Sequence, residues 1–286
     1  MNALKKYFSL VKFSHSIFAL PFAFQGAWLA AGGVPGPRRL ALIVICAVAA
    51  RTAAMAFNRL IDRKIDAANP RTASREIPAG VIRPGAATLL VLISCGIFLA
   101  GAWALGPLCL RFAPAVLLVL LGYSTFKRFS SLAHFALGLA LALAPLGAWL
   151  AIRGNLEGDL APVLWLSFGV LTWVAGFDLI YACQDADYDA GAGLHSIPAK
   201  LGVARALGLS VALHVVAVGA FFAEGWLAGL GWPYWVAFSI ATLLLIWEHC
   251  IVSADDLSRV NAAFFTINGW VGVGLFAGVA LDLALA

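Results

Sequence analysis

Charged residues are scarce in this chain of 286 residues. Asp, Glu, Lys and Arg together make up 12% of it, whereas hydrophobic residues make up 63% and the mean hydropathy is +0.94. A soluble domain has roughly 25% charged and 45–50% apolar residues. This composition therefore excludes a soluble domain and indicates an integral membrane protein. The net charge of +5 is then typical of basic residues retained on the cytoplasmic side of a membrane, and no nucleic-acid partner is expected.

Cysteine is also sparse and irregularly placed. There are five cysteines, mostly inside apolar runs, and no two of them have the spacing of a metal site. An odd, scattered set does not form a disulfide framework. We therefore expect small buried side chains at Cys46, Cys95, Cys109, Cys183 and Cys250.

Long apolar runs dominate the chain. A hydrocarbon core of about 30 Å needs about 20 apolar residues per helix. The nine predicted spans are residues 16–33, 39–57, 86–105, 109–126, 131–151, 160–181, 204–223, 232–251 and 261–283. We expect an all-α bundle of about nine transmembrane helices forming one domain over 1–286, with two motif-bearing halves at roughly 1–130 and 131–286.

The composition of the spans predicts a central cavity. The 28 glycines allow helices to pack closely around such a space. Several spans also carry aromatic residues that we expect to line it: Trp28, Phe57, Trp149, Phe168, Trp173 and Phe177.

The basic residues fix the expected orientation. With the N-terminus inside, fourteen Lys and Arg residues lie at inner ends or in inner loops, against four outside (Arg38, Arg39, Arg111 and Arg153). Arg51 falls within the second span and is left out of this count. The strong positive-inside bias predicts a cytoplasmic N-terminus.

Two acidic segments lie at inner ends of spans. Asn58, Asp62 and Asp66 have i, i+4, i+8 spacing, which would place them on one face of a helix. Tyr181, Asp185 and Asp189 repeat that spacing. Acidic residues are so few, 14 in all, that six of them in these two segments, counting Asp178 and Asp187, favour a function over a solvated helix face. Clustered carboxylates suit Mg²⁺, which prefers oxygen ligands.

Basic residues accompany the acidic segments. The inner loop after Asp66 carries Arg71 and Arg75 between two prolines, and we expect it to form a cap that brings one of these arginines to the metal site. Lys127 and Arg128 follow the fourth span. An anchoring role at the membrane interface is an equally good interpretation of that pair.

Carboxylates, cations and an apolar cavity together suggest a diphosphate carried on an apolar chain. Carboxylates alone would repel a diphosphate, but metal ions bridge the two and Lys or Arg offset the remaining charge. An isoprenoid diphosphate is the expected substrate of this kind in a membrane. Its diphosphate would be a leaving group, and the same charges would stabilise it as the allylic C–O bond ionises.

These motifs resemble those of the UbiA-type membrane prenyltransferases. Asn58-Arg-Leu-Ile-Asp62-Arg-Lys-Ile-Asp66, followed by Asn69-Pro-Arg71-Thr, is similar to the first motif of the family. Tyr181-Ala-Cys-Gln-Asp185-Ala-Asp-Tyr-Asp189 is similar to the second, and Tyr123 to Arg128 is similar to a Tyr-x-x-x-Lys element. The resemblance covers nearly the whole chain and implies a helical bundle with a central cavity, two Mg²⁺ ions and cytoplasmic caps.

The resemblance also implies roles for individual residues. The implied metal ligands are Asn58, Asp62, Asp66, Asp185 and Asp189. The implied diphosphate-binding residues are Arg71, Lys127, Arg59, Tyr123, Ser124 and Arg128. Many members have Asp where this chain has Arg59, which removes one acidic ligand and adds a cation.

Within the family, the stretch Phe13 to Ala23 and the pair Asn58-Arg59 look most like the 4-hydroxybenzoate polyprenyltransferases, and more narrowly like bacterial relatives that prenylate a naphthoate in menaquinone synthesis. The implied acceptor is a small aromatic carboxylate used in ubiquinone or menaquinone synthesis, with His15 in contact with it. The implied location is the bacterial inner membrane, with the active site cytoplasmic. Hydroxybenzoate and naphthoate both remain open.

The acceptor side is assigned to the helix of the second motif. Asp178 and Tyr181 precede Asp185 by about two turns and one turn on the same helical face, so they would lie deeper than the metals. We expect one of them to orient the acceptor or to take its proton, although Asp178 could instead bond to a neighbouring helix. Two other classes also have paired acidic motifs: a transporter with an internal repeat and a CDP-alcohol phosphotransferase.

Overall fold

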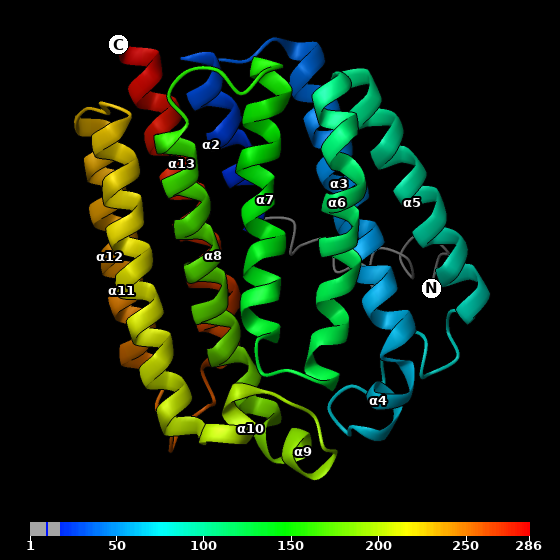
Figure 1. The fold of residues 1–286 in the computed structure, drawn as a ribbon. Coiled ribbons are helices and arrows are strands. Elements are labelled where there is room, and N and C mark those ends of the chain that lie inside the picture. Colours follow the sequence, from blue (N-terminus) through cyan, green and yellow to red (C-terminus); the bar gives the residue numbers. More distant parts are fainter. Residues whose placement is uncertain (1–9, 11–17) are drawn as a thin grey trace.

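Long apolar helices form the body of the protein, whose computed structural model describes Leu10 and residues 18–286 (Figure 1). The helices are α2 (Leu20–Ala31), α3 (Pro37–Ile61), α4 (Arg63–Ala68), α5 (Pro84–Leu105), α6 (Pro107–Gly122), α7 (Ala133–Arg153), α8 (Ala161–Ala182), α9 (Ala186–Gly191), α10 (Ile197–Leu201), α11 (Val203–Leu227), α12 (Trp232–Ile251) and α13 (Asn268–Leu285). Short 3₁₀ turns at Tyr123–Arg128 and Cys183–Asp185 and a π-helix at Ala262–Ile267 complete them. No strand occurs in these ranges, so the all-α prediction is confirmed.

Eight helices in the described part of the chain are long and apolar enough to cross a membrane. They correspond to the second to ninth predicted spans. The first predicted span, 16–33, contains α2, which has 12 residues and begins next to residues outside the described ranges. The prediction of an integral membrane bundle of about nine helices is confirmed to that extent.

Helix α8 lies at the centre of the bundle and packs against α7 and α11. A glycine permits α7 to approach α8 closely, because a Cβ on Gly138 of α7 would lie 2.4 Å from the carbonyl oxygen of Leu171 in α8. Gly26 of α2 does the same for α7, where a Cβ would lie 2.3 Å from the carbonyl oxygen of Pro145. Larger side chains at these positions would push the helices apart.

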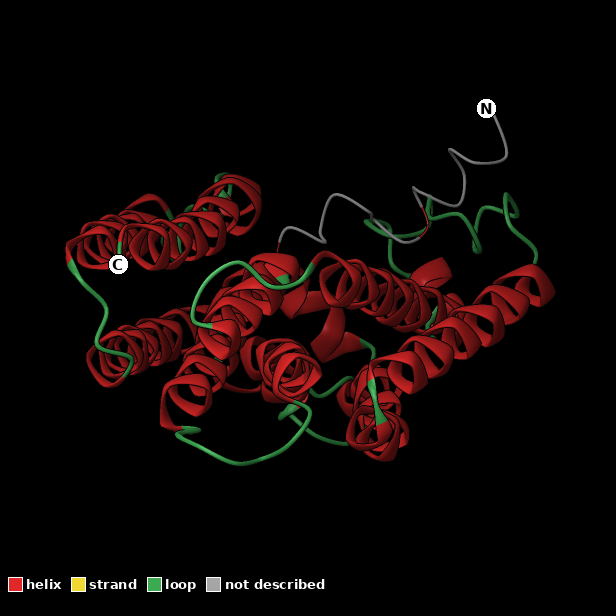
Figure 2. Cartoon of the chain, turned by 90° about the horizontal axis from the view of Figure 1, so that it is seen from above, coloured by secondary structure: helices red, strands yellow, loops and turns green. Residues whose placement is uncertain are grey.

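Seen from above, the long helices lie side by side (Figure 2), and the two sides of the bundle differ in the side chains that fill them. Around α8, α11, α12 and α13, an aromatic core of buried residues that includes Phe22, Trp173, Phe177 and Phe221 occupies the space between helices. Around α3, α5, α6 and α7, alanines predominate and leave a cavity. Aromatic side chains bury a large area when they pack on one another, so they fill the first side and leave the second hollow.

The short helices gather at one end of the bundle, at the bottom of Figure 1, which we call the motif end. Helix α4 follows α3 there, and α9 and α10 lie between α8 and α11. The two acidic segments therefore meet at the same end of the molecule. This is the arrangement that the predicted topology requires.

Candidate active site

The first acidic segment bends where it leaves the bundle. Helix α3 ends at Ile61 and α4 begins at Arg63, so the three motif residues do not lie on one uninterrupted helix as predicted. The helical spacing nevertheless persists, because the amide of Asp62 donates to the carbonyl of Asn58 and that of Asp66 to the carbonyl of Asp62. Asp62 and Asp66 are 1% and 3% exposed, so both carboxylates turn inward.

The second acidic segment is interrupted in a similar way. Helix α8 ends at Ala182, a 3₁₀ turn carries Asp185, and α9 carries Asp189. The hydroxyl of Tyr188 in α9 donates to the carbonyl oxygen of Ile65 in α4 at 3.0 Å. This bond joins the two segments, which are more than a hundred residues apart in the sequence.

Asp62 is the most heavily paired carboxylate. Its Oδ2 lies 2.6 Å from Nζ of Lys127, and its Oδ1 lies 2.9 Å from a guanidinium nitrogen of Arg128. The side-chain amide of Asn58 also donates to Oδ2 at 3.3 Å. A buried carboxylate left without partners would cost several kcal/mol, and these cations are the partners that offset that cost.

Asp66 has one satisfied oxygen and one free oxygen. Arg75 donates to Oδ1 at 2.6 Å. The buried Oδ2 has no hydrogen-bond partner among the residues that the structure describes. An ionised carboxylate oxygen in this state is an available ligand for a cation.

Asp185 receives its partners from the loop that follows α4. Arg71 donates to both of its oxygens, with the Nε bond at 2.7 Å, and Asn69 donates to Oδ1 at 3.1 Å. Arg71 also donates to the hydroxyl of Tyr181 at 3.1 Å. Burial alone would lower the pKa of the Arg71 guanidinium, but the hydrogen bonds and charge of Asp185 raise it above its ordinary value. The expected cap is therefore present, and it brings both Arg71 and Arg75 to the acidic segments.

The remaining motif residues surround these pairs. Asp189 is half-buried in α9 and hydrogen-bonds Ser196, while Asp187 is exposed. Arg59 is 6% exposed, and its Nε has no partner within the described ranges. Ser124 is buried beside Tyr123. His15 lies outside the described residues.

Asp178 bonds to a neighbouring helix. Its Oδ2 lies 2.7 Å from Nδ1 of His134 at the start of α7. The Asp178 side chain is still 22% exposed, so the pairing does not seal it off. Tyr181, one turn later, packs its ring on Phe264 with a centroid separation of 4.4 Å.

The donor set fits a hard cation. Every acidic group of the two segments presents oxygen, and the unpartnered oxygen of Asp66 lies among them. In the described ranges, no three acidic, His or Cys residues are close enough together to hold a metal. The carboxylates of Asp62, Asp66 and Asp185 instead form ion pairs with lysine and arginine side chains. These residues fit Mg²⁺ by their chemistry.

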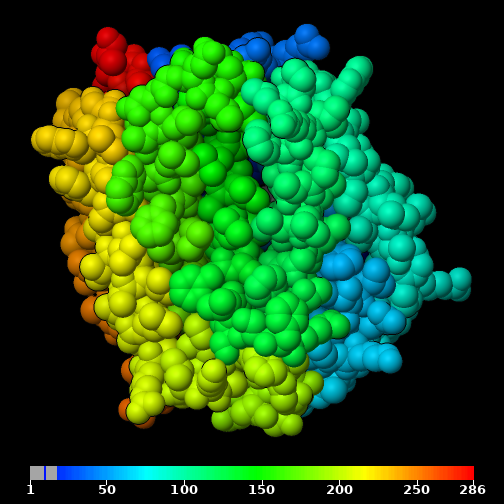
Figure 3. Space-filling view, viewed as in Figure 1, coloured from blue at the N-terminus to red at the C-terminus, as the bar shows by residue number. Residues whose placement is uncertain are grey.

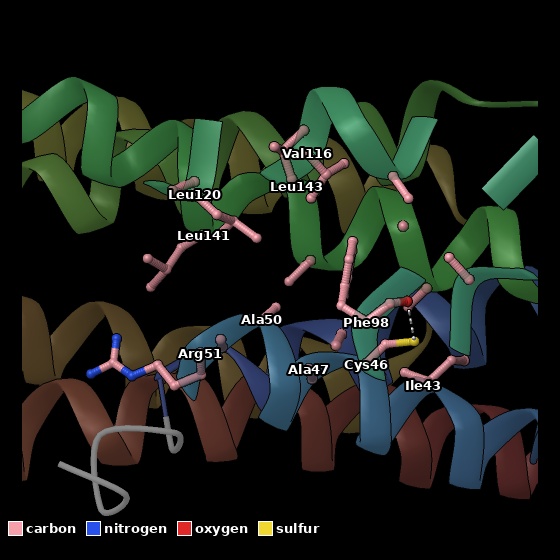
Figure 4. Close-up of a pocket in the computed structure, with 18 of the residues that line it drawn as sticks. Ile43, Cys46, Ala47, Ala50, Arg51, Phe98, Val116, Leu120, Leu141 and Leu143 are labelled. Carbon is pink, nitrogen blue, oxygen red and sulfur yellow. Dashed lines mark hydrogen bonds between the residues drawn. The ribbon is translucent and has the colours of Figure 1, made fainter. Parts of the chain in front are cut away.

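An apolar cavity of about 170 Å³ lies within the bundle, and its lining includes Ala54 and Tyr123, which precede Asn58 and Lys127 by one helical turn each. The space-filling view shows a hollow between α6 and α7 (Figure 3), and the close-up shows its wall formed by α3 and α5 to α7 (Figure 4). Most of its lining is alanine and leucine, and the six aromatic residues expected to line it are not among the described lining residues. That expectation is wrong because Trp173 and Phe177 pack into the aromatic core, whereas Phe168 is 43% exposed.

Two polar residues line the cavity, Arg51 from α3 and Tyr123 from the turn after α6. Figure 4 places Arg51 at one end, with Ile43 and Cys46 toward the other. The Nε of Arg51 is buried without a hydrogen-bond partner in the described part of the chain. Its position within a predicted span was a signal in the sequence, because a charge at that depth is costly without a function.

Comparison with known proteins agrees with these features. The model of the UbiA prenyltransferase family matches residues 19–270. The 4-hydroxybenzoate octaprenyltransferase of Herminiimonas arsenicoxydans is 29% identical, with 99% of both chains covered. That of Paracidovorax citrulli is 30% identical, with 99% of this chain and 96% of the relative covered.

Solved structures show the same fold. The apo structure of a UbiA homolog from Aeropyrum pernix K1 is 36% identical, covers 94% of this chain and 98% of that chain, and has a TM-score of 0.85. A UbiA homolog from Archaeoglobus fulgidus, bound to GPP and Mg²⁺, shares the fold at 20% identity, with 94% and 99% covered and a TM-score of 0.66. The chain therefore belongs to the UbiA prenyltransferase family, which confirms the membrane fold and the enzyme class that its sequence predicts.

Proposed function

We propose that this protein transfers a polyprenyl group from an allylic polyprenyl diphosphate to a small aromatic carboxylate, with Mg²⁺ as cofactor. The observation that supports this most strongly is the junction of two chemically different compartments. A cluster of buried carboxylates and cations lies at the motif end, and an apolar cavity is lined by Arg51, whose Nε has no hydrogen-bond partner in the described part of the chain. The first compartment suits a diphosphate and the second suits a prenyl chain and an aromatic acid.

The diphosphate side uses the cations that now pair with the carboxylates. Lys127, Arg71 and Arg75 are 31%, 33% and 23% exposed, so each can reach an anion that enters from the motif end. Arg59, Arg128, Tyr123 and Ser124 would complete this side. When bound to Asn58, Asp62, Asp66, Asp185 and Asp189, Mg²⁺ supplies positive charge that offsets the leaving diphosphate. The side chains of Lys127 and Arg71 stabilise the same charge through hydrogen bonds.

The acceptor side is built on Arg51. A guanidinium binds a carboxylate in a fixed planar geometry, and the Nε of Arg51 has no hydrogen-bond partner among the described residues. An acid held there would place its ring in the cavity between Arg51 and the diphosphate residues. The relatives named as 4-hydroxybenzoate octaprenyltransferases support a hydroxybenzoate acceptor, and a dihydroxynaphthoate has the same carboxylate.

Asp178 and Tyr181 take different places in this scheme. Tyr181 is hydrogen-bonded to Arg71, which associates it with the diphosphate. Asp178 keeps a carboxylate that is 22% exposed and lies about two turns before Asp185 along the second segment, which suits removal of the ring proton. The whole chain would act as a single domain of the bacterial inner membrane with its motif end toward the cytoplasm.

Membranes containing the protein test this function directly. They would be incubated with an allylic polyprenyl diphosphate, Mg²⁺ and a panel of hydroxybenzoates and naphthoates, and the lipid extract would be analysed by mass spectrometry. We expect a product whose mass equals acceptor plus prenyl group minus one hydrogen. If no aromatic acid is prenylated while the diphosphate is consumed, the proposed acceptor class is wrong.

A further inference from the structure

His134 is a buried polar residue that the family motifs do not include. It lies in the first turn of α7, is 3% exposed, and contacts Asp178 of α8 through Nδ1 at 2.7 Å. Its Nε2 is buried and has no hydrogen-bond partner in the ranges described. A buried polar atom without a partner costs about 1–3 kcal/mol, so a packing role alone would favour an apolar residue here.

The hydrogen bond between His134 and Asp178 has a defined donor and acceptor. An ionised carboxylate only accepts hydrogen bonds, so Nδ1 of His134 carries the hydrogen and donates it to Oδ2 of Asp178. The bond restrains the carboxylate and leaves its other oxygen, Oδ1, for a second partner. Asp178 therefore has one oxygen that His134 positions and one that is available.

The surroundings place Asp178 close to a residue that lines the cavity. Tyr123, which lines the cavity with Arg51, is close enough to Asp178 to interact with its charge. Asp189 from α9 lies within electrostatic range of His134 and Lys127. These groups lie near the pair in the turn after α6 and in α9, and none of them is hydrogen-bonded to Oδ1 of Asp178 within the described part of the chain.

We propose that His134 is a positioning residue, which holds the Asp178 carboxylate so that Oδ1 can accept the ring proton of the aromatic acceptor. This inference rests on the proposed function. In the step, the allylic C–O bond breaks and its electron pair leaves with the diphosphate. A ring carbon then forms the new C–C bond, and its C–H bond breaks to restore aromaticity. The proton passes to Oδ1 of Asp178 and later to water at the motif end.

Two amide substitutions separate positioning from packing. Asparagine places its amide nitrogen where Nδ1 of histidine lies, whereas glutamine places it near Nε2. His134→Asn can therefore keep the bond to Asp178, and His134→Gln cannot keep it in the same geometry. A third variant, His134→Phe, keeps the ring and removes both nitrogens.

The purified full-length variants would be assayed for prenylation of 4-hydroxybenzoate and for KM of the allylic diphosphate. We expect kcat to fall by about 10- to 100-fold in His134→Gln and His134→Phe, and by less than about 3-fold in His134→Asn, with the diphosphate KM little changed in all three.

The outcomes that overturn the inference are distinct from failure of the proposed function. Equal kcat values for the Asn and Gln variants, both near wild type or both reduced, refute positioning through Nδ1. If His134→Phe does not fold, as judged by its unfolding temperature, the comparison of the two amides still decides. If the wild-type protein forms no prenylated aromatic product, the proposed function itself fails and the inference falls with it.

Discussion

Replacement of Arg51 by methionine separates binding of the acceptor from stability of the fold. Arg51 is half-buried and forms no ion pair with the described residues, so it contributes a desolvation cost and its removal should leave the unfolding temperature unchanged or raise it. The same change removes the proposed partner of the acceptor carboxylate. A hydrogen bond to a charged group contributes about 1.5–3 kcal/mol, which corresponds to an increase of about 10- to 150-fold in the acceptor KM.

The assay compares two acceptors that differ only in the carboxylate. Wild-type protein should strongly prefer 4-hydroxybenzoate to phenol, and Arg51→Met should reduce that preference by the same factor of about 10 to 150, with the diphosphate KM unchanged. Arg51→Lys is the matched control, because it retains the charge without the planar geometry and should lose less. If Arg51→Met keeps the wild-type preference, or if it unfolds more readily than wild type, Arg51 is a structural residue and the assigned acceptor site is wrong.

Three further predictions concern the motif end. Asp66→Ala and Asp185→Ala should each abolish prenyl transfer, measured by product formation, without preventing membrane insertion, measured by detergent-extracted yield. Near-wild-type turnover of both variants at low Mg²⁺ would contradict their assignment as metal ligands. Lys127→Ala and Arg71→Ala should each weaken binding of the allylic diphosphate by about 1.5–3 kcal/mol, measured by competition with a labelled diphosphate, and unchanged affinity in both would make them interfacial anchors. Tyr181→Phe removes the hydroxyl that accepts from Arg71 and should raise the diphosphate KM more than it lowers kcat, and the opposite pattern would place Tyr181 on the acceptor side.

The sequence predicted correctly that the two acidic segments lie at the same end of the bundle, but it did not predict which side chains contact each other there. The spacing of Asp62 and Asp66 and that of Asp185 and Asp189 placed both pairs at one end of the bundle, because hydrophobic spans and basic residues determine which end each loop occupies. The bond between Arg71 and Asp185 joins residues 114 positions apart, and it depends on the path of a loop that has no periodic pattern. Local spacing contains no information about that path.

The cavity shows a similar limit. Aromatic residues were expected to line it, but Trp173 and Phe177 pack on each other with centroids 4.8 Å apart and fill the opposite side of the bundle. Which helices enclose empty space depends on where small side chains face one another in three dimensions. Arg51 was visible in the sequence as a charge within a span, whereas His134 carried no signal, since histidine near the end of a span is common at membrane interfaces.

Parallel measurement of both products tests most directly whether this protein transfers a prenyl group from an allylic diphosphate to an aromatic carboxylate and needs Mg²⁺ to do so. Purified protein would be given both substrates, and released diphosphate and prenylated aromatic product would be measured together, with and without chelation of divalent cations. We expect one diphosphate to be released for each prenylated product formed. Both products should disappear when Mg²⁺ is removed and return when Mg²⁺ is restored. Diphosphate release without an aromatic product, or full transfer in the presence of the chelator, would contradict the proposed function.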